Sequence, residues 1–428
     1  MKEIRVCVFP AHGESGVEIN NALSQCEGIF VYGIAVIPGH SAYNFINYTP
    51  NFLDIDEEGF DDKFESFILE NQIDVVFPTS DATLLYFSEN QSKFSAKFVN
   101  CDAYSANICN DKRKTYELFK EYSFCPKLYK KPEKFPCFIK PFDGEGARGA
   151  MLLNNAEEVP IGYDWSQYVC SEYLPGTEMT VDCITDYNGE LKAVLPRIRK
   201  KTFAGMCVMG ETVEVTAEIA EIAETINSHL KFRGLWFFQV KQDDNGVYKL
   251  LEISMRCAGT MCMTRARGYN LPLLSVYTTM GKPIQCIENN LDVTISRTLF
   301  ARYKTSCNFS TVYVDYDGTI VIKNKVSLSI IRFLYQCKNE NKKIVMITRH
   351  NEDHNNTIYE DLDDYGISKK LFDEIICLRF DEKKSSVIKD EDAIFIDNSF
   401  FERKEVSEAK NIPVFAVEGI DLLQDWRL

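Results

Sequence analysis

Histidine and paired cysteine motifs are scarce in this chain, and their scarcity excludes the common transition-metal sites. The chain has only five histidines, and none of its 15 cysteines forms a CxxC pair. Structural zinc sites need such ligands at short, regular spacing. The cysteines lie scattered from Cys7 to Cys377, which is typical of buried, reduced thiols. We therefore expect a protein of the reducing cytoplasm without structural zinc.

Long apolar runs are also missing. The sequence has no stretch of about 18 apolar residues, which is roughly the length that a helix needs to cross a membrane. The N-terminal sequence Met-Lys-Glu-Ile-Arg leads straight into a short strand-forming run, without the apolar core of a secretory signal. The sequence thus predicts neither a membrane span nor a leader.

The chain has fewer basic residues than acidic ones. The chain has 48 lysines and arginines against 63 aspartates and glutamates, a formal net charge of −15. Proteins that bind nucleic acids or anionic membranes usually present a basic surface. We therefore expect small-molecule partners rather than a nucleic acid or a membrane, while local basic sites for small anions stay open.

The order of the predicted elements divides the chain into three parts. Residues 1–100 alternate strand runs, such as Arg5–Phe9 and Ile29–Ile37, with helical segments such as Phe60–Glu70. This alternation favours a parallel sheet with crossover helices. Residues 101–305 predict hairpins and one long amphipathic helix. After a linker at Lys304–Ser310, strands and helices alternate again from residue 308 to residue 428.

A hairpin in the second part carries the first group of polar residues. Two apolar strand runs flank Asn245–Gly246, and Asn-Gly favours a two-residue type I′ turn. That register places Gln239 opposite Glu252, with their Cβ atoms about 5 Å apart, and Ser254 and Arg256 on the same sheet face as Glu252. Oxygen ligands beside a guanidinium suit Mg²⁺ that is bound largely by nucleotide phosphates. The alternative is a solvated hairpin face with polar pairs.

Residues suited to a nucleotide precede this hairpin. Lys140 ends a strand run just before the glycine-rich loop Asp143–Gly149, whose amides can close over phosphate oxygens. Lys112 heads a predicted helix, where an anion is stabilised. A strand ends at Glu172 in a short linker that could offer backbone groups to a purine, and Glu178 could bind ribose hydroxyls. The alternative is a mobile surface loop with an incidental lysine.

These motifs occur in the order used by ATP-grasp enzymes, and residues 1–305 resemble the carbamoyl-phosphate-synthetase-like and related carboxylate–amine ligases. The resemblance implies an α/β protein with an N-terminal Rossmann-like pre-ATP-grasp domain (1–100) and an ATP-grasp α+β domain with a mobile lid (101–305). It implies ATP and Mg²⁺ as cofactors. The implied ATP-binding residues are Lys112, Lys140, Gly146, Glu172, Tyr173, Leu174 and Glu178.

The resemblance also assigns the metal site. It implies Gln239 and Glu252 as Mg²⁺ ligands and Arg256 as the group that stabilises the transferring phosphoryl group. Ser254 stands where the family usually has asparagine. A serine oxygen is a shorter ligand, so a second Mg²⁺ is expected to be weaker, water-bridged or absent.

The implied chemistry begins with a carboxylate, which is a poor electrophile. ATP converts it into an acyl phosphate that an amine attacks, while Mg²⁺ and cationic side chains stabilise the charge. We see no second ATP-grasp repeat, glutaminase domain or biotin-carrier segment, so we expect ligation of a small amine or amino acid to a carboxylate. Arg197 and Arg199 are candidate clamps for the acceptor carboxylate, and Arg265 and Arg267 are weaker candidates. Each could instead be a solvated surface charge.

Acidic residues at the start of the third part form another group. The apolar run Thr311–Ile320 predicts a strand end that carries Asp315 and Asp317, whose side chains point the same way. One carboxylate can attack phosphorus while the other serves as acid and base, and two adjacent acids favour a bound Mg²⁺. A calcium loop or a simple turn is the alternative, against which the preceding apolar strand argues.

Three further polar residues accompany this pair: Thr348 and Asp397 end strand runs, and Lys384 opens a helical segment. The whole set resembles the haloacid-dehalogenase (HAD) superfamily over residues 308–428, which implies a Rossmann-like domain. The implied roles are nucleophile for Asp315, general acid and base for Asp317, phosphate binding for Thr348 and Lys384 (with Lys383 as a near alternative), and Mg²⁺ binding for Asp315, Asp317 and Asp397.

Two features depart from the fullest HAD pattern. Asn398 follows Asp397 where many members have a second aspartate, so Glu402 or Asn398 itself is the candidate to support the metal. The short intervals between the motifs also leave little room for a cap domain. We therefore expect a capless site, open to a large substrate or covered by a neighbouring domain.

These resemblances together predict a bifunctional cytoplasmic enzyme. Its ATP-grasp part would join a carboxylate to an amine, and its HAD part would remove a phosphate ester from the amine substrate or from the ligated product. Two alternatives stay open: the HAD part could be a non-catalytic docking or regulatory module, or the ATP-grasp part could only bind nucleotide. A homo-oligomer also stays open.

Overall fold

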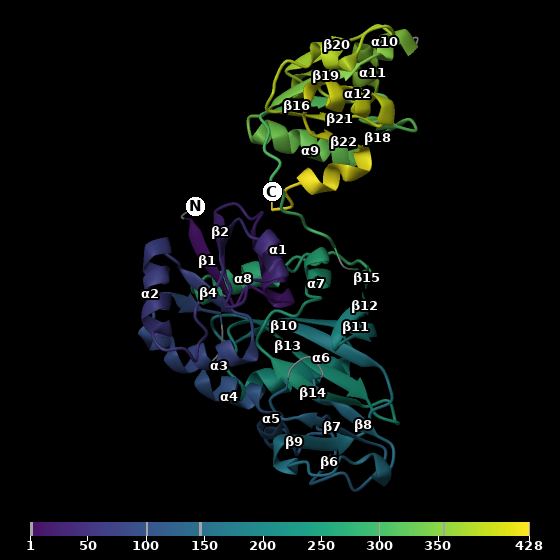
Figure 1. Cartoon of the computed structure of the whole chain (residues 1–428). Helices are drawn as coiled ribbons and strands as arrows, with labels where there is room; N and C mark the ends of the chain where they lie inside the picture. Colours follow the sequence, from purple (N-terminus) through teal and green to yellow (C-terminus); the bar gives the residue numbers. More distant parts are fainter. Residues whose placement is uncertain (1–2, 100–101, 145–147, 299, 354–355, 428) are drawn as a thin grey trace. The chain divides into compact units, whose positions relative to one another are not determined.

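The structure is a computed structural model of the chain, and it describes all residues except 1–2, 100–101, 145–147, 299, 354–355 and 428. The chain divides into two compact units, residues 1–299 and residues 300–428. Figure 1 shows the helices and strands of both. Among the helices of the described ranges, none combines the length and the apolar character needed to cross a membrane.

A parallel five-stranded sheet opens the first unit, in the order β3-β2-β1-β4-β5. Its strands are β1 (Ile4–Phe9), β2 (Ile29–Ile34), β3 (Asn47–Thr49), β4 (Val75–Pro78) and β5 (Lys97–Phe98). The helices of this part are α1 (Glu14–Leu23), α2 (Phe60–Asn71) and α3 (Asp81–Asn90). The parallel sheet predicted for residues 1–100 is confirmed, although β2 ends at Ile34 and not at Ile37.

An antiparallel six-stranded sheet follows, in the order β14-β13-β10-β11-β12-β15. Its strands are β10 (Glu178–Thr185), β11 (Leu191–Phe203), β12 (Met206–Thr212), β13 (Gly234–Gln242), β14 (Tyr248–Ser254) and β15 (Thr294–Ser296). Helix α6 (Ala217–His229) buries Ile222 and Ile226 in one cluster with Val181 and Phe238 of the sheet. The predicted amphipathic helix is therefore confirmed.

A smaller antiparallel sheet, in the order β6-β9-β7-β8, carries the strand before the glycine-rich loop. Its strands are β6 (Leu128–Tyr129), β7 (Cys137–Pro141), β8 (Met151–Leu153) and β9 (Tyr168–Glu172). The other α-helices of the first unit are α4 (Ala103–Asn110), α5 (Lys112–Leu118), α7 (Cys262–Ala266) and α8 (Leu271–Thr279). Its 3-10 helices are η1 (His40–Tyr43), η2 (Gln91–Lys93), η3 (Ala156–Glu158) and η4 (Trp165–Gln167).

The parallel sheet and the six-stranded sheet share one hydrophobic core. Val6 and Phe77 of the parallel sheet belong to the same buried cluster as Leu235 and Phe237 of β13 and Leu271 of α8. Burial of apolar surface is the main force that holds such layers together. This shared core explains why residues 1–299 form one unit. The domain boundary that we expected at residue 100 lies inside this unit.

The β13–β14 hairpin has the predicted pair in its middle but another register at its turn. Gln239 pairs with Glu252 as predicted, whereas the next pair is Val240 with Leu250. The register shift leaves Leu251 outside the pairing, which is a β-bulge.

The two-residue turn predicted for this hairpin is wrong. The main-chain N–H of Asp243 donates to the carbonyl of Val247 at 2.9 Å, which closes a longer loop. The side chain of Asp243 causes this, because its Oδ1 accepts the N–H groups of Asn245 and Val247 at 2.9 and 3.0 Å. Asp side chains often organise loops through such contacts with the backbone that follows.

A second parallel sheet lies at the centre of residues 300–428, in the order β20-β19-β16-β21-β22. Its strands are β16 (Thr311–Val314), β19 (Lys343–Thr348), β20 (Glu374–Cys377), β21 (Ala393–Ile396) and β22 (Val414–Phe415), and β17 (Val321–Ile322) pairs with β18 (Lys325–Val326). The α-helices are α9 (Leu328–Asn339), α10 (His350–Asp353), α11 (Ile358–Asp364) and α12 (Phe400–Lys410). The 3-10 helices are η5 (Lys369–Leu371), η6 (Lys384–Val387) and η7 (Val417–Leu423).

The central strand β16 is buried along its whole length and ends at Val314, not at Ile320 as predicted. The chain turns after it, because Gly318 adopts a φ of +77° and its N–H donates to the carbonyl of Val321 at 2.8 Å. Glycine suits this left-handed conformation. Since β16, β19 and β21 run parallel, the residues after their ends meet at one edge of the sheet, where α/β proteins bind ligands.

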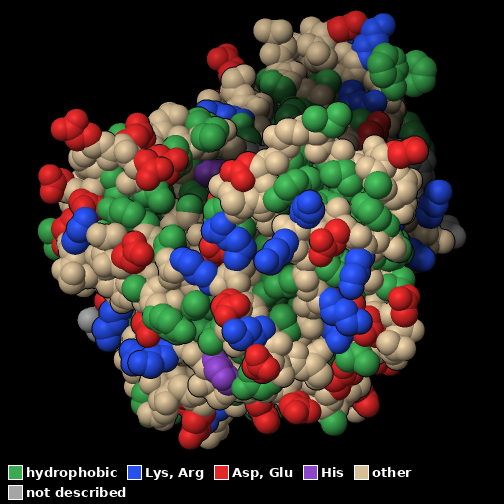
Figure 2. All heavy atoms as spheres, turned by 90° about the horizontal axis from the view of Figure 1, so that it is seen from below, with side chains coloured by type: hydrophobic (Ala, Val, Ile, Leu, Met, Phe, Trp, Pro, Cys, Tyr) green, Lys and Arg blue, Asp and Glu red, His purple; other side chains and the backbone are tan. Residues whose placement is uncertain are grey.

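The surface shown in Figure 2 mixes charges of both signs. Acidic side chains (red) and basic side chains (blue) are interspersed with apolar ones on this face and do not gather by sign. The expectation of small-molecule partners stays a prediction.

Candidate functional site

A cavity of about 300 Å³ in the first unit collects many of the residues predicted to bind nucleotide, metal and substrate. Its walls come from α1, α5, β7, the six-stranded sheet and the segment after β14. The charged and polar side chains that line it include Glu14, Lys112, Lys140, Glu178, Arg197, Arg199, Gln239, Glu252, Arg256 and Thr260. Residues from both ends of the unit thus meet in one cavity.

Two lysines present positive charge to this cavity. Lys112 Nζ donates to the carbonyl of Gly144, and Lys140 Nζ donates to the carbonyl of Leu251, each at 2.7 Å. Burial, together with the nearby charge of Lys112, lowers the pKa of Lys140 to about 7. Within the described part of the chain, neither ammonium forms an ion pair with a carboxylate. An anion in the cavity, such as a nucleotide phosphate, would favour the charged form of Lys140.

The β-bulge positions the acceptor for Lys140. Because Leu251 lies outside the β13–β14 pairing, its carbonyl is available to other donors. It accepts Lys140 Nζ at 2.7 Å and the hydroxyl of Tyr116 at 2.8 Å. The bulge therefore ties the strand that carries Lys140 to the strand that carries Glu252.

Gln239 and Glu252 offer oxygen atoms for a metal. They face each other across β13 and β14, and both line the cavity. No group of three or more His, Cys, Asp or Glu side chains among the described residues could hold a metal ion. Mg²⁺ commonly takes only one or two carboxylates and completes its shell with water and phosphate oxygens, so this pair fits a nucleotide-bound Mg²⁺. Such an ion would neutralise charge during phosphoryl transfer, beside Arg256 in the same cavity.

The side chain of Ser254 forms a hydrogen bond outside the Gln239–Glu252 pair. Its hydroxyl donates to Oδ1 of Asp81 at 3.0 Å, and Arg256 Nε lies 3.6 Å from the same oxygen. Asp81 is the first residue of α3. Ser254 thus links β14 to the N-terminal part of the unit and does not line the cavity.

Arg197 lines the cavity, but its guanidinium is paired within the protein. It is only 1% exposed, it forms an ion pair with Asp182, and its Nε donates to Thr260 Oγ1 at 2.9 Å. A buried pair of this kind is costly to break, so Arg197 belongs to the cavity wall. Arg199 also lines the cavity, and its Nε lies 2.8 Å from Glu178 Oε1.

The two weaker arginine candidates lie outside the cavity lining. Arg265 Nη2 is 2.9 Å from Glu18 Oε1 on α1, and Arg267 forms an ion pair with Glu288. Burial raises the pKa of Glu18 to about 7, although Arg265 opposes this shift. Both arginines therefore join segments of the unit and do not reach the cavity, which corrects their predicted role.

The predicted adenine-binding residues have a mixed outcome. Glu172, Tyr173 and Leu174 are not part of the cavity lining, whereas Glu178 is. Leu174 is buried, with 5% of its surface exposed. Gly146 lies outside the described residues. The adenine site thus stays a prediction.

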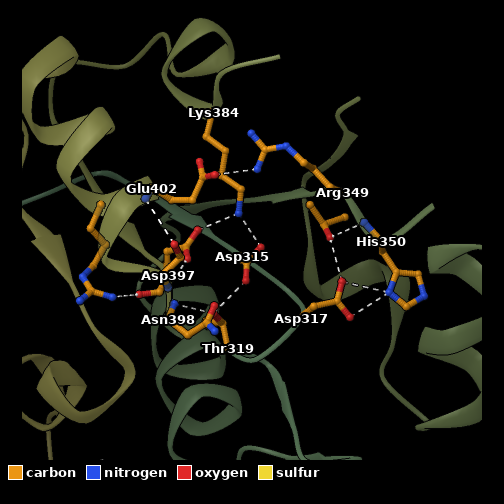
Figure 3. A network of polar contacts seen from close by, with 12 residues as sticks. Asp315, Asp317, Thr319, Arg349, His350, Lys384, Asp397, Asn398 and Glu402 are labelled. Atoms are coloured by element: carbon orange, nitrogen blue, oxygen red, sulfur yellow. Dashed lines mark hydrogen bonds and ion pairs between the residues drawn. The ribbon is translucent and has the colours of Figure 1, made fainter. Parts of the chain in front are cut away.

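A second group of charged residues lies at the strand ends of the second unit (Figure 3). Lys384 Nζ is 2.6 Å from Asp315 Oδ1 and 2.7 Å from Asp397 Oδ2. Thr319 donates its hydroxyl to the other oxygen of Asp315 at 2.9 Å. Lys384 is buried while Lys383 is exposed. The buried lysine of the two is therefore Lys384, which opens a 3-10 helix.

Burial and neighbouring charges shift the pKa values of this group in opposite directions. Burial raises the pKa of Asp315 to about 6, against the pull of Lys384. Burial alone would lower the pKa of Lys384, but Asp315 and Asp397 outweigh it and raise that pKa. Two neighbouring carboxylates are also the hard oxygen ligands that Mg²⁺ prefers, so Asp315 and Asp397 fit this ion as well.

Asp317 faces a histidine that the sequence analysis missed. Nδ1 of His350 lies 3.0 Å from both carboxylate oxygens of Asp317, and Thr348 donates its hydroxyl to Asp317 Oδ2 at 3.4 Å. His350 comes two residues after the predicted Thr348. The signal was its position just after a buried strand, where polar side chains reach the same sheet edge.

The two residues expected to support the metal are engaged by other groups. Glu402 forms an ion pair with Arg349 at 2.9 Å. The side chain of Asn398 packs against the turn at Gly318, where a Cβ atom would lie 2.4 Å from its Nδ2. The described contacts therefore do not favour either residue as a metal ligand.

Comparisons with known proteins reach the first unit. Residues 165–298 match the family model described as "ATP-grasp in the biosynthetic pathway with Ter operon". Over 132 residues the chain is 27% identical to the D-alanine–D-alanine ligase of Thermotoga petrophila, which covers 27% of this chain and 44% of that protein. The chain thus spans less than half the length of this curated relative.

Solved structures show a similar fold. One is the biotin carboxylase domain of the 2-oxoglutarate carboxylase from Hydrogenobacter thermophilus, in complex with MgADP, ADP and bicarbonate, with a TM-score of 0.55, 13% identity and coverage of 67% of this chain and 71% of that chain. Another is the L-amino acid ligase from Bacillus licheniformis, with a TM-score of 0.52, 14% identity and coverage of 67% and 76%. ATP and Mg²⁺ are the cofactors of ATP-grasp ligases, and the lysines and the Gln239–Glu252 pair fit both. Residues 165–298 therefore match an ATP-grasp family model, and the chain is similar in fold to these solved structures over 67% of its length.

Proposed function

We propose that the first unit is a ligase that joins a carboxylate to an amine through an acyl phosphate. The observation that carries this proposal is the single cavity in which Lys112 and Lys140 meet the Gln239–Glu252 pair. The γ-phosphate of an ATP molecule bound in this cavity would lie among cationic groups and metal ligands. The names of two similar proteins, a D-alanine–D-alanine ligase and an L-amino acid ligase, support an amino acid as one substrate.

Five of the residues that line the cavity have a role in this reaction. Lys112 and Lys140 bind the phosphates of ATP, and Gln239 and Glu252 hold the Mg²⁺ that neutralises them. A carboxylate oxygen attacks the γ-phosphorus, ADP leaves, and Arg256 stabilises the charge on the transferring group. The amine then attacks the carbonyl carbon of the acyl phosphate, inorganic phosphate leaves with the bonding electrons, and the nitrogen loses a proton to the solvent.

We further propose that the second unit is a HAD-type phosphatase. The cluster of Asp315, Lys384 and Asp397 at the edge of a parallel sheet supports it. Asp315 attacks the phosphorus of a phosphate ester, and Asp317 protonates the leaving oxygen. Asp317 then takes a proton from the water that hydrolyses the aspartyl phosphate. Thr348 and Lys384 bind the phosphoryl oxygens.

One experiment separates the two activities in the full chain. Carboxylates and amines, with and without a phosphate ester, are incubated with MgATP while ADP release is followed, and ester hydrolysis is measured without ATP. At a fixed, low Mg²⁺ concentration Glu252→Gln should lower only the ligase activity, and Asp315→Asn should abolish only the hydrolysis. Release of all organic phosphate by Asp315→Asn would contradict the phosphatase assignment. A wild-type chain that hydrolyses no ester with Mg²⁺ would support a docking or regulatory module instead.

A further inference from the structure

His350 is a buried side chain aimed at a more exposed carboxylate. The imidazole is 2% exposed, whereas the side chain of Asp317 is 35% exposed. Nδ1 of His350 lies 3.0 Å from each oxygen of that carboxylate. In Figure 3, Asp317 is turned toward His350, while Asp315 is turned toward Lys384. The two aspartates are therefore held by different partners.

The ring of His350 is itself held from several sides. The backbone that carries the ring is held too, because the main-chain N–H of His350 donates to Thr348 Oγ1 at 3.0 Å. The ring of Tyr316 meets it edge to face, with centroids 5.3 Å apart and planes at 89°. The Tyr316 hydroxyl donates to Asp361 Oδ2 at 2.6 Å, and that oxygen lies 3.9 Å from His350 Nε2. Contacts on several sides fix the orientation of the imidazole.

The fixed orientation of the imidazole is important because of the position of Asp317. Asp317 follows the end of β16 in the turn at Gly318, and its carboxylate is partly exposed. Ordering such a side chain costs conformational entropy. A hydrogen bond from a rigid, buried donor lowers that cost, since the donor loses little freedom of its own.

We propose that His350 is a positioning residue for Asp317, and that its Nδ1–H holds the carboxyl group where it delivers its proton to the leaving oxygen. This inference rests on the proposed phosphatase function. As the Asp315–phosphorus bond forms, the ester P–O bond breaks and the leaving oxygen takes the proton of Asp317. In the second step water loses a proton to Asp317 and attacks the phosphorus, so Asp315 and the protonated Asp317 are regenerated.

The test compares two phosphate esters that differ in their need for an acid. Ethyl phosphate has a poor leaving group that must be protonated, whereas p-nitrophenyl phosphate releases a stable anion. The full chain with Mg²⁺ is assayed as wild type, His350→Ala, His350→Asn and His350→Gln. We expect His350→Ala to lower kcat/KM for ethyl phosphate by about 10²-fold, the scale of general acid–base catalysis. The loss for p-nitrophenyl phosphate should be at least tenfold smaller.

The amide variants separate positioning from a packing role. The amide nitrogen of asparagine can stand near the place of Nδ1, whereas that of glutamine reaches the place of Nε2. We expect His350→Asn to recover most of the lost activity on ethyl phosphate, and His350→Gln to recover little. Equal losses on both esters, or equal recovery by both amides, would overturn the inference. If wild type hydrolyses neither ester, the phosphatase proposal fails, and the role of His350 fails with it.

Discussion

Lys140 donates through Nζ to the main-chain carbonyl of Leu251 at 2.7 Å, and Leu251 is the residue that a bulge removes from the β13–β14 pairing. A backbone acceptor holds the amine without neutralising its charge. Lys140 is therefore positioned by the fold and still lacks a carboxylate partner among the described residues, which leaves it ready for a phosphate.

The pKa of Lys140 predicts that nucleotide binding takes up a proton. Without ligand that pKa is about 7, so at pH 8.5 the amine is mostly neutral. Bound phosphate favours the charged form, and the affinity for MgADP should therefore be constant below pH 7 and fall as the pH rises above it. Calorimetric titration at pH 8.5 in two buffers of different ionisation enthalpy measures the uptake. Lys140→Arg is the control, because arginine stays protonated, and equal uptake by both proteins would contradict the prediction.

Glu252→Gln should weaken Mg²⁺ binding at the ligase site. The change keeps the size of the side chain but removes the one carboxylate of the Gln239–Glu252 pair. We expect the Mg²⁺ concentration for half-maximal ADP release to rise on the order of 10²-fold. Asp244→Asn, an exposed position in the loop of the same hairpin, makes the same change of charge and should leave this concentration unaltered. A similar shift in both variants would show a general effect of charge.

Lys384→Met should destabilise the second unit. The substitution leaves the buried carboxylates Asp315 and Asp397 without the ammonium between them. Removing one partner from a buried ion pair costs about 3–5 kcal/mol. Urea unfolding of the full chain, followed with a probe in residues 300–428, measures the loss. The neighbouring exposed residue provides the matched control, since Lys383→Met should change the stability by less than about 0.5 kcal/mol.

Glu18 predicts a pH dependence of the stability of the first unit. Burial raises its pKa from 4.5 to about 7, so the folded state favours the protonated carboxyl group. This contribution to the free energy of unfolding is fully present below pH 4.5 and is lost as the pH rises through 7. Measured against Glu18→Gln, wild type should lose about 2.5 kcal/mol between pH 5 and pH 8. Parallel unfolding curves for the two proteins over this range would show that Arg265 compensates the buried charge in full.

Strong local patterns were sufficient to predict many elements. The strand predicted at Arg5–Phe9 forms as Ile4–Phe9, and the helix predicted at Phe60–Glu70 forms as Phe60–Asn71. The Gln239–Glu252 pair was also predicted correctly, although by way of a turn that does not form. The Asp243 side chain widened the loop by one residue and the bulge at Leu251 restored the register, so the two departures cancelled.

Other features depended on contacts between distant segments. Arg197, predicted as a substrate clamp, is almost fully buried and forms an ion pair with Asp182 of a neighbouring strand. Arg265 was predicted to meet substrate, but α7 brings it to Glu18 of α1. His350 was not singled out, because nothing in its own sequence shows that its ring faces Asp317.

The sequence by itself determined which lysines, carboxylates and arginines lie at strand ends and in loops of this protein. It also determined their order along the chain. The tertiary structure alone decided which of these charges face a cavity, as Lys140 and Glu252 do, and which pair with each other elsewhere, as Arg265 and Glu18 do. The physical reason is that the strength of an ion pair depends on burial and distance. Both follow from how strands and helices far apart in the chain pack together, which local sequence patterns do not encode.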